Sequence, residues 1–280
     1  ILFGWFFGNL SRLGSCLSNK KPSLLSMARS KRKNENRPEE VEASEGMDLS
    51  ADDSQSAEQQ TPTNRPGWAA AGLAALVLFF VLAFLFRESF LPGTVLFAND
   101  APLGFIKHVF ENGRDGWGGW IDHTWVGYAQ PMGGPRFTTL FAVLCAGSDG
   151  QGAVSFANYY APACLWVLGM CAWIFFRQLG CGSAVCLLGA LAAALNGAFF
   201  TYATWGLPVR ALAAGMTFLA LAALASGGGR RWWPAAVLAG LAVGQGVMEA
   251  YDIGALFSLY AAVYAVFMVL SREGWSLLSL

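Results

Sequence analysis

The feature that most constrains the fold is a run of twenty residues, Gly67–Phe86, that contains no charged side chain. About 20 apolar residues in a helix cross the core of a bilayer, where the backbone must satisfy its own hydrogen bonds. Five further apolar runs follow: Asn158–Phe176, Ser183–Phe200, Pro208–Ala225, Trp233–Val247 and Ile253–Leu270. The sequence therefore predicts an all-α, polytopic transmembrane helical bundle with about six spans, of which the short Trp233–Val247 is the weakest.

Composition supports the membrane class. Apolar residues make up 55% of the chain and charged residues 13%, which is too apolar for an ordinary soluble domain of this length. The formal net charge is zero, so the charge balance predicts no nucleic-acid partner. The cysteines form no CxxC pair and no disulfide framework. We interpret the five that lie in or beside apolar runs as small core residues: Cys145, Cys164, Cys171, Cys181 and Cys186. The partner that composition indicates is the lipid bilayer.

The first 66 residues have a different composition. Residues 27–66 are rich in Glu, Asp, Ser, Gln and Lys, and we predict a disordered cytoplasmic tail over residues 1–66. Met27 looks like a natural start, and we expect residues 1–26 to be upstream read-through or a linker. Residues 67–280 are the predicted transmembrane domain. Because the chain stops at Leu280 within an apolar stretch, we expect further spans after it.

The charge distribution predicts the orientation of the spans. With the tail in the cytoplasm, the short loops that carry basic residues also face the cytoplasm, as the positive-inside rule expects; these residues are Arg177, Arg230, Arg231 and Arg272. The same threading places most acids that follow the tail on the outer side: Glu88, Asp100, Glu111, Asp115, Asp122, Asp149, Glu249 and Asp252. Both signals predict a cytoplasmic amino terminus.

The segment between the first two spans, residues 87–157, is a long outer loop. Within it, apolar residues at helical spacing predict a short amphipathic helix on the membrane surface; they are Leu103, Ile106, Val109 and Phe110. A second apolar piece, Phe137–Ala146, is too short to span and is predicted to be an interfacial or re-entrant helix. A stretch rich in Gly and Pro between the two predicts irregular loop.

Asp100 is the first candidate for chemistry. A carboxylate at the membrane boundary can act as a general base or hold a divalent cation through oxygen ligands. Asp100 is followed by Ala101 and Pro102, which is equally the pattern of a helix N-cap whose side chain accepts a backbone N–H. The two interpretations stay open.

Asp122 and His123 form a second candidate group in the same loop. A carboxylate next to an imidazole can bind a substrate or a metal, or move a proton. The residues around them match no known metal-ligand spacing, so the sequence identifies neither a metal nor another cofactor. Solvated loop residues are the simpler interpretation.

Glu249 and Asp252 are a third group, at the junction of the fifth and sixth runs. Three residues apart, they would share a face if one helix continued through both. Acids near the membrane are functional candidates, and we assign both, with Asp100, to catalysis. The alternative is that they mark the point where the chain reaches water.

Arg210 and Trp205 complete the predicted site. A guanidinium just inside the fourth run, on the outer side, can hold a phosphate through two hydrogen bonds. It can equally reach lipid headgroups or pair with an outer acid. Trp205 offers a ring face to a sugar, although an interfacial aromatic belt also explains it.

Together these features resemble a known superfamily. A cytoplasmic tail, one span and a long outer loop with an early aspartate are similar to the C-type (GT-C) membrane glycosyltransferases. The segments VLFANDAPLG, GWIDHTWVG, NGAFFTYATWG and GQGVMEAYDIG resemble, more narrowly, the YfhO-like bacterial membrane proteins. The resemblance covers roughly residues 67–270 and implies a GT-C-like fold in a bacterial inner membrane.

The resemblance also implies roles for residues. The donor in that superfamily is commonly a polyprenyl-phosphate sugar, and an acid of the first outer loop serves as base or metal anchor, which Asp100 matches. A later outer acid is matched by Glu249 or Asp252, and the residue that takes the lipid phosphate by Arg210. Asn99 stands where some relatives have a second acid, so metal dependence is left open.

We therefore expect a membrane glycosyltransferase-like protein in which Asp100 deprotonates the acceptor and Arg210 steadies the departing phosphate. Two other functions stay open. A transporter or flippase-like protein would place ionisable residues within the membrane and contain broken helices around a central site. A non-catalytic membrane assembly protein would have acids that point apart, toward water.

Overall fold

The computed structural model describes residues 67–96, 98–111, 120–121, 128–129, 137–146, 151–227 and 232–273. Most of the described residues, 67–268, belong to one compact unit, and residues 269–273 belong to a second. The predicted tail, residues 1–66, lies outside the described residues. The candidate site residues that the structure describes all belong to the first unit.

The regular secondary structure of the described residues is helical apart from one pair of two-residue strands, β1 (Trp120–Ile121) and β2 (Tyr128–Ala129), which pair antiparallel. The long helices are α3 (Trp68–Leu85), α6 (Gly152–Gln178), α9 (Pro208–Ser226), α10 (Trp232–Glu249) and α11 (Tyr251–Glu273). The short ones are η1 (Arg87–Phe90), α4 (Leu103–Glu111), α5 (Phe137–Ala146), α7 (Ser183–Ala194) and α8 (Gly197–Trp205). The predicted helical class is confirmed, and both predicted loop helices are present as α4 and α5.

Four of the described helices are long and apolar enough to cross a membrane: α3, α6, α9 and α11. The pair α7 and α8 forms a fifth candidate, bent by 44° between the two helices. α10 covers the predicted fifth run but is not among these candidates, because Gln245 and Glu249 in its last turns lower its hydropathy. Length and composition thus give four or five spans, where the sequence predicts about six.

The bend between α7 and α8 has a local cause. The side-chain oxygen of Asn196 accepts a hydrogen bond from the amide of Ala198 at 3.1 Å and so caps the start of α8. Asparagine is among the preferred N-cap residues because its side chain replaces a missing helical acceptor. The run Ser183–Phe200, predicted as one span, is therefore divided between two helices.

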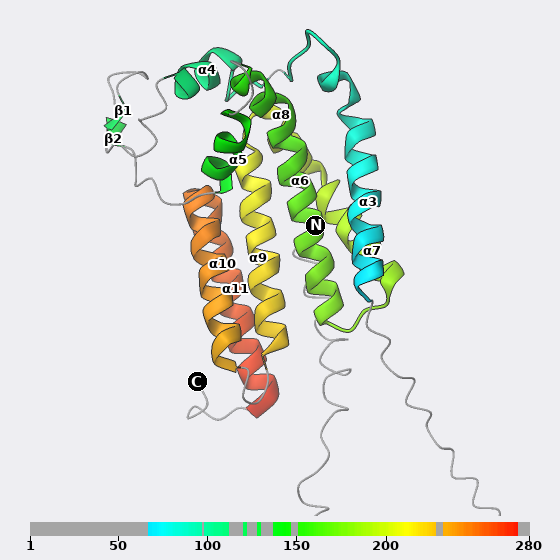
Figure 1. The fold of residues 1–280 in the computed structure, drawn as a ribbon. Helices are drawn as coiled ribbons and strands as arrows, with labels where there is room; N and C mark the ends of the chain where they lie inside the picture. Colours follow the sequence, from blue (N-terminus) through cyan, green and yellow to red (C-terminus); the bar gives the residue numbers. More distant parts are fainter. Residues whose placement is uncertain are drawn as a thin grey trace, which may run out of the picture. The chain divides into compact units, whose positions relative to one another are not determined.

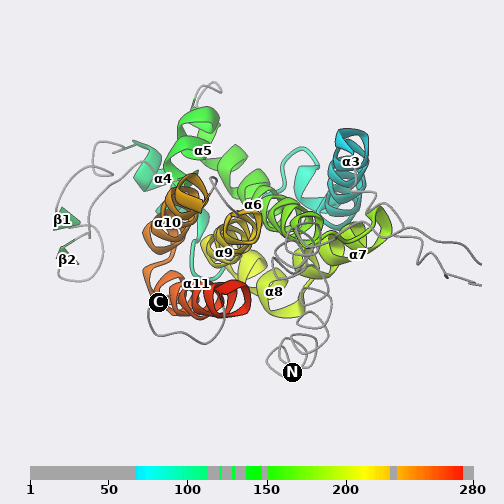
Figure 2. The same cartoon turned by 90° about the horizontal axis from the view of Figure 1, so that it is seen from below.

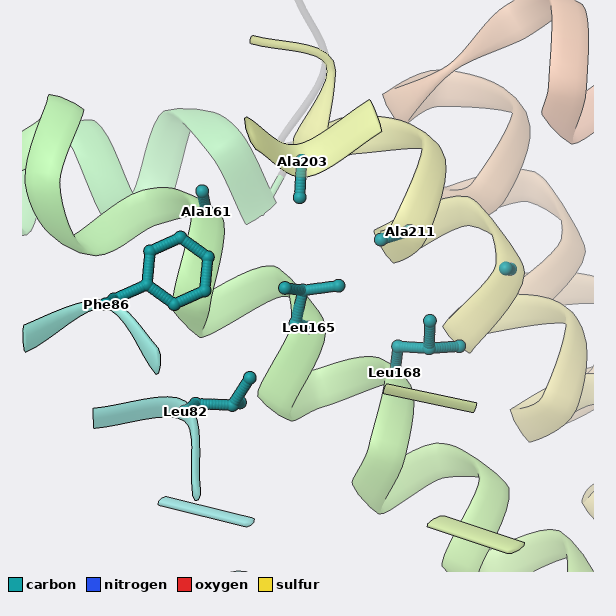
Figure 3. Close-up of a cluster of buried hydrophobic side chains, with 8 residues drawn as sticks. Leu82, Phe86, Ala161, Leu165, Leu168, Ala203 and Ala211 are labelled. Carbon is teal, nitrogen blue, oxygen red and sulfur yellow. The ribbon is translucent and has the colours of Figure 1, made fainter. Parts of the chain in front are cut away.

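The core lies where α6 meets its neighbours α3, α7 and α9. Figure 2, seen along the bundle, shows α6 and α9 between α3 on one side and α10 on the other. One buried cluster joins side chains of α3, α6, α8 and α9 (Figure 3); it includes Leu82, Ala161, Leu165, Leu168, Ala203 and Ala211. Small residues let these helices approach: a Cβ added at Gly215 of α9 would lie 3.2 Å from the Cα of Leu168.

The two ends of the bundle differ. At one end, which we call the loop end, α3 and α10 end and α6, α9 and α11 begin, and α4, α5 and α8 gather there (Figure 1). At the opposite end the guanidinium of Arg177 lies 5.2 Å from the ring centre of Trp68 and 5.7 Å from that of Trp173. The candidate acids that the structure describes, Glu249 and Asp252 among them, belong to the loop end.

Candidate functional site

The site at the loop end is built on the turn that joins α8 to α9. Gly206 ends α8 with a left-handed backbone, φ 101°, which favours glycine. The carbonyl of Tyr202 accepts the amide of Leu207 at 2.8 Å, and Pro208 then begins α9. This sharp reversal places Arg210 in the first turn of α9.

Arg210 forms an ion pair with a residue of α11. Its Nη2 donates to Oδ2 of Asp252 at 3.0 Å, and its guanidinium carbon lies 4.7 Å from the ring centre of Tyr202. The Arg210 side chain is 25% exposed and that of Asp252 is 48% exposed, so water reaches both groups. The start of a helix carries partial positive charge, so a cation there is unfavourable unless an anion accompanies it. Asp252 supplies that anion.

Asp100 is tied to the same turn through its backbone. The amide of Asp100 donates to the carbonyl of Trp205 at 2.9 Å. A Cβ added at Gly206 would lie only 2.7 Å from the amide nitrogen of Ala101, so the loop passes directly over the glycine. The segment that leads to Asp100 is held by buried Asn158 of α6, which accepts from the amide of Leu96 at 2.8 Å and donates to the carbonyl of Thr94 at 3.2 Å.

The side chain of Asp100 is exposed, and its Oδ1 accepts a hydrogen bond from Asn99 at 3.2 Å. α4 begins three residues later, and the amides of Phe105 and Ile106 donate to the carbonyl of Pro102. Among the described residues the carboxylate of Asp100 therefore contacts Asn99 and no amide of α4. The predicted N-cap contact is not formed there, and the catalytic role of Asp100 stays a prediction.

Glu249 has a different environment. It is 6% exposed, and its Oε1 accepts from the amides of Phe137 and Thr138 (3.3 Å for Thr138) and from Nε2 of Gln245 at 2.9 Å. Its Oε2 accepts from the hydroxyl of Thr138 at 2.5 Å, and that hydroxyl also contacts the hydroxyl of buried Tyr160. Glu249 thus contacts the first turn of α5, which is far from it in sequence.

The structure brings together only part of the predicted set. Arg210 and Asp252 meet, and the amide of Asp100 bonds to exposed Trp205 on the turn before Arg210. Glu249 and Asp252 lie on two helices, since α10 ends at Glu249 and α11 begins at Tyr251, so the premise of one continuous helix is wrong. Asp122 and His123 lie outside the described residues.

Three residues that organise this end were not predicted from the sequence: Asn158, Thr138 and Tyr160. An amide inside an apolar run is a usable signal for Asn158, because a buried amide needs hydrogen-bond partners. Thr138 and Tyr160 carry no such signal, because both residue types are common at membrane interfaces and their partners are distant in sequence. No group of three or more His, Cys, Asp or Glu able to hold a metal ion occurs in the described part of the chain.

The fold and the site together define a class: this is an integral membrane protein, a helical bundle with a polar cluster at one end. No family model, no curated protein and no solved structure matches the chain.

Proposed function

We propose that the chain is a membrane glycosyltransferase-like protein of GT-C-like fold, acting at the loop end on a sugar carried by polyprenyl phosphate. The observation that carries the proposal is Arg210. It is a guanidinium in the first turn of a spanning helix, stacked on Tyr202 and paired with a carboxylate that water reaches. Arg210 holds Asp252 through one hydrogen bond, whereas a phosphate can accept two from a guanidinium and carries more charge, so it can replace Asp252 on Arg210.

In the proposed reaction, the acceptor hydroxyl oxygen forms a bond to the anomeric carbon of the sugar, and the bond from that carbon to the phosphate oxygen breaks. Asp100 takes the proton of the acceptor hydroxyl, and the departing polyprenyl phosphate keeps the electron pair and stays on Arg210. Two observations support the pairing of roles. Asp100 is exposed, and its backbone is bonded to the turn that positions Arg210.

The proposed site faces the outer side of a bacterial inner membrane, with the tail in the cytoplasm. Arg177 supports this orientation, because it lies in the last turn of α6, away from the loop end, where the positive-inside rule expects a basic residue. The count of about six spans includes α10 as a short span of lower hydropathy. In the proposed function, Glu249 contributes its contacts with α5, and Asp252 is the carboxylate that the phosphate displaces from Arg210.

Binding of the lipid phosphate is the first test. The protein in nanodiscs is titrated with polyprenyl phosphate and with polyprenol, and stabilisation is read from thermal unfolding. We expect stabilisation by the phosphate only, and loss of it in Arg210→Ala. Arg87→Ala is the matched control, because Arg87 is an exposed arginine at the same end that stacks on Phe84 at 4.9 Å. Equal stabilisation of both variants by polyprenyl phosphate would contradict the proposed role of Arg210 in binding the phosphate.

The transfer step is tested with polyprenyl-phosphate-linked hexoses, by release of polyprenyl phosphate in the presence of candidate glycan acceptors. Asp100→Asn keeps the shape of the side chain and removes the base, so we expect release to fall by about 100-fold or more. Asn99→Ala is the neighbouring control and should retain release. Release that persists in Asp100→Asn would remove Asp100 from catalysis.

A transporter-like function is the second candidate, and two observations favour it. The α7–α8 span is broken with a 44° bend, and a buried acid, Glu249, lies among the helices. Transporters use broken helices and buried ionisable groups for their substrates. Movement of a labelled polyprenyl-phosphate lipid between leaflets of vesicles, without release of its sugar, would favour this function over transfer.

A further inference from the structure

The first turn of α5 is capped by a residue from another helix. The leading amides of any helix have no acceptor within the helix and are usually satisfied by the side chain just before it. Here the amides of Phe137 and Thr138 donate to Glu249 of α10, a residue 112 and 111 positions away. A carboxylate at the start of a helix also interacts favourably with its dipole. α5 and α10 are thus joined by one side chain.

The hydroxyl groups around Glu249 have a fixed direction. Thr138 has one hydroxyl hydrogen, and the geometry assigns it to Oε2 of Glu249. The hydroxyl of Tyr160 must then donate to Thr138, and the amide of Gln245 donates to Oε1. Every donor points toward the carboxylate, so the cluster joins α5 to both α6 and α10.

This arrangement leaves Glu249 little capacity to act as a general base. Oε1 already accepts three hydrogen bonds and Oε2 accepts one, all from protein groups. A general base must reach the proton that it takes, and Glu249 is 6% exposed. A substrate hydroxyl would first have to displace the start of α5.

One face of α5 packs on the bundle, where Phe137 and Phe141 join a cluster with buried Tyr160, Cys164 and Leu212. Phe141 stacks near Tyr160 and Phe156 of α6, with ring centres 5.4 and 6.0 Å away. The opposite face carries exposed Leu140, Val143 and Leu144. α5 has ten residues, too few to cross a bilayer.

We propose that Glu249 is a positioning residue that docks α5 on the bundle by capping it from α10, and that this docking, not proton transfer, is the role of its carboxylate. The proposal goes beyond the glycosyl transfer function and does not depend on it. It predicts that α5 can undock while the rest of the bundle stays folded.

Cys145 near the end of α5 is a built-in reporter. Its side chain is half-buried, and burial raises the pKa of its thiol, so undocking should increase both its exposure and its thiolate fraction. The chain of residues 1–280 carrying Cys16→Ser and Cys181→Ser is labelled with a maleimide in nanodiscs. We expect Glu249→Ala to speed labelling of Cys145 by about tenfold or more, since a charge-assisted hydrogen bond contributes at least that factor.

Two buried thiols away from α5 report the rest of the bundle: Cys171 and Cys186. Cys164 is replaced with serine, because it packs in one cluster with Phe137 and Phe141 of α5. We expect Cys171 and Cys186 to stay unlabelled in Glu249→Ala. Equal acceleration at these thiols would overturn the proposal, because Glu249 would then hold the whole bundle and not α5. Unchanged labelling of Cys145 would overturn it as well.

Two substitutions separate positioning from other roles. In Glu249→Gln the side-chain oxygen still accepts from the amides of α5, and the side-chain nitrogen donates to the hydroxyl of Thr138. That hydroxyl then donates to Tyr160 and no longer accepts from it. Because α5 keeps its hydrogen bonds, the rate of labelling of Cys145 should stay within about threefold of the rate in the parent chain. In Asp252→Ala an acid at the same end is removed without touching α5, and labelling should not change. Labelling in Glu249→Gln as fast as in Glu249→Ala would overturn the proposal.

Thr138→Val covers the case in which Glu249→Ala does not fold. It removes one of the four hydrogen bonds to the carboxylate and keeps the shape of the side chain. We expect labelling of Cys145 to rise by about threefold to tenfold. The same rate as in the parent chain would contradict docking through this cluster.

Discussion

The surroundings of Glu249 and of Asp252 make an instructive comparison, because two acids three residues apart have opposite environments. Glu249 is buried and bonded to amides and hydroxyls, whereas Asp252 is half exposed and paired with one arginine. Between them the helix breaks at Ala250, and Gly254 then passes so close to the carbonyl of Gly246 that a Cβ would not fit. A buried carboxylate whose oxygens accept hydrogen bonds from protein groups stabilises the fold. In a solvent-exposed ion pair, by contrast, a ligand can take the place of one partner.

The largest expected effect is that of Glu249→Leu. It leaves several buried donors of α5 without an acceptor, so we expect stability to fall by about 3 kcal/mol and the melting temperature by about 6–12 °C. The measurement is thermal unfolding of the purified protein in nanodiscs. Asp252→Leu is the matched control and should shift the midpoint far less. Similar shifts in both variants would remove the contrast between the two acids.

Gly206→Ala tests the turn that carries Arg210. A side chain at φ 101° is strained, and the new Cβ would also lie 2.7 Å from the amide nitrogen of Ala101, so we expect a loss of about 2–3 kcal/mol. Gly180→Ala is the control with φ 82° and no neighbour within 4 Å, and it should cost about 1 kcal/mol. Equal costs in unfolding experiments would show that the Asp100 loop does not rest on this turn.

Thr138→Val should cost about 1–1.5 kcal/mol, because it removes the hydroxyl between Glu249 and Tyr160. Thr217→Val is the control: its hydroxyl bonds only to Ala213 one turn back in α9, and its removal should change stability little. A double-mutant cycle with Glu249→Leu, which removes every acceptor at position 249, measures the coupling directly. No coupling between positions 138 and 249 would contradict the shared cluster.

The smallest effect is expected for Asp252→Asn. Exposed ion pairs contribute about 0–1 kcal/mol, so we expect a loss below about 1 kcal/mol that shrinks further at high salt. Unfolding midpoints at low and high salt measure it. A loss as large as that of Glu249→Leu would mean that the pair with Arg210 is structural and not exchangeable.

Much of the helical fold follows from the sequence because apolar runs and their interruptions are local. The predicted helix Phe137–Ala146 has the bounds of α5, and Pro208 begins both the predicted fourth run and α9. The break within the third run was missed, although Asn196 followed by Gly197 is a local signal for a helix cap.

The site was less predictable because its contacts join distant segments. The pairing of Arg210 with an outer acid was one of the alternatives that the sequence left open, and the structure assigns it to Asp252. The partner of Glu249 was not predictable, since nothing near it in the sequence indicates that its carboxylate faces Thr138. Burying an acid costs free energy wherever it lies in the sequence, but only the packing decides which hydrogen-bond donors compensate for that cost.

The long separation between Glu249 and α5 has a consequence for biosynthesis. A ribosome adds about 5–20 residues per second, so the 112 residues between Phe137 and Glu249 take about 6–22 s to make. During that interval the amides of the first turn of α5 must form hydrogen bonds to water or to lipid headgroups, and the helix lies at the surface of the nascent bundle. If Glu249 docks α5 as proposed, this docking is completed only after α10 has emerged from the ribosome.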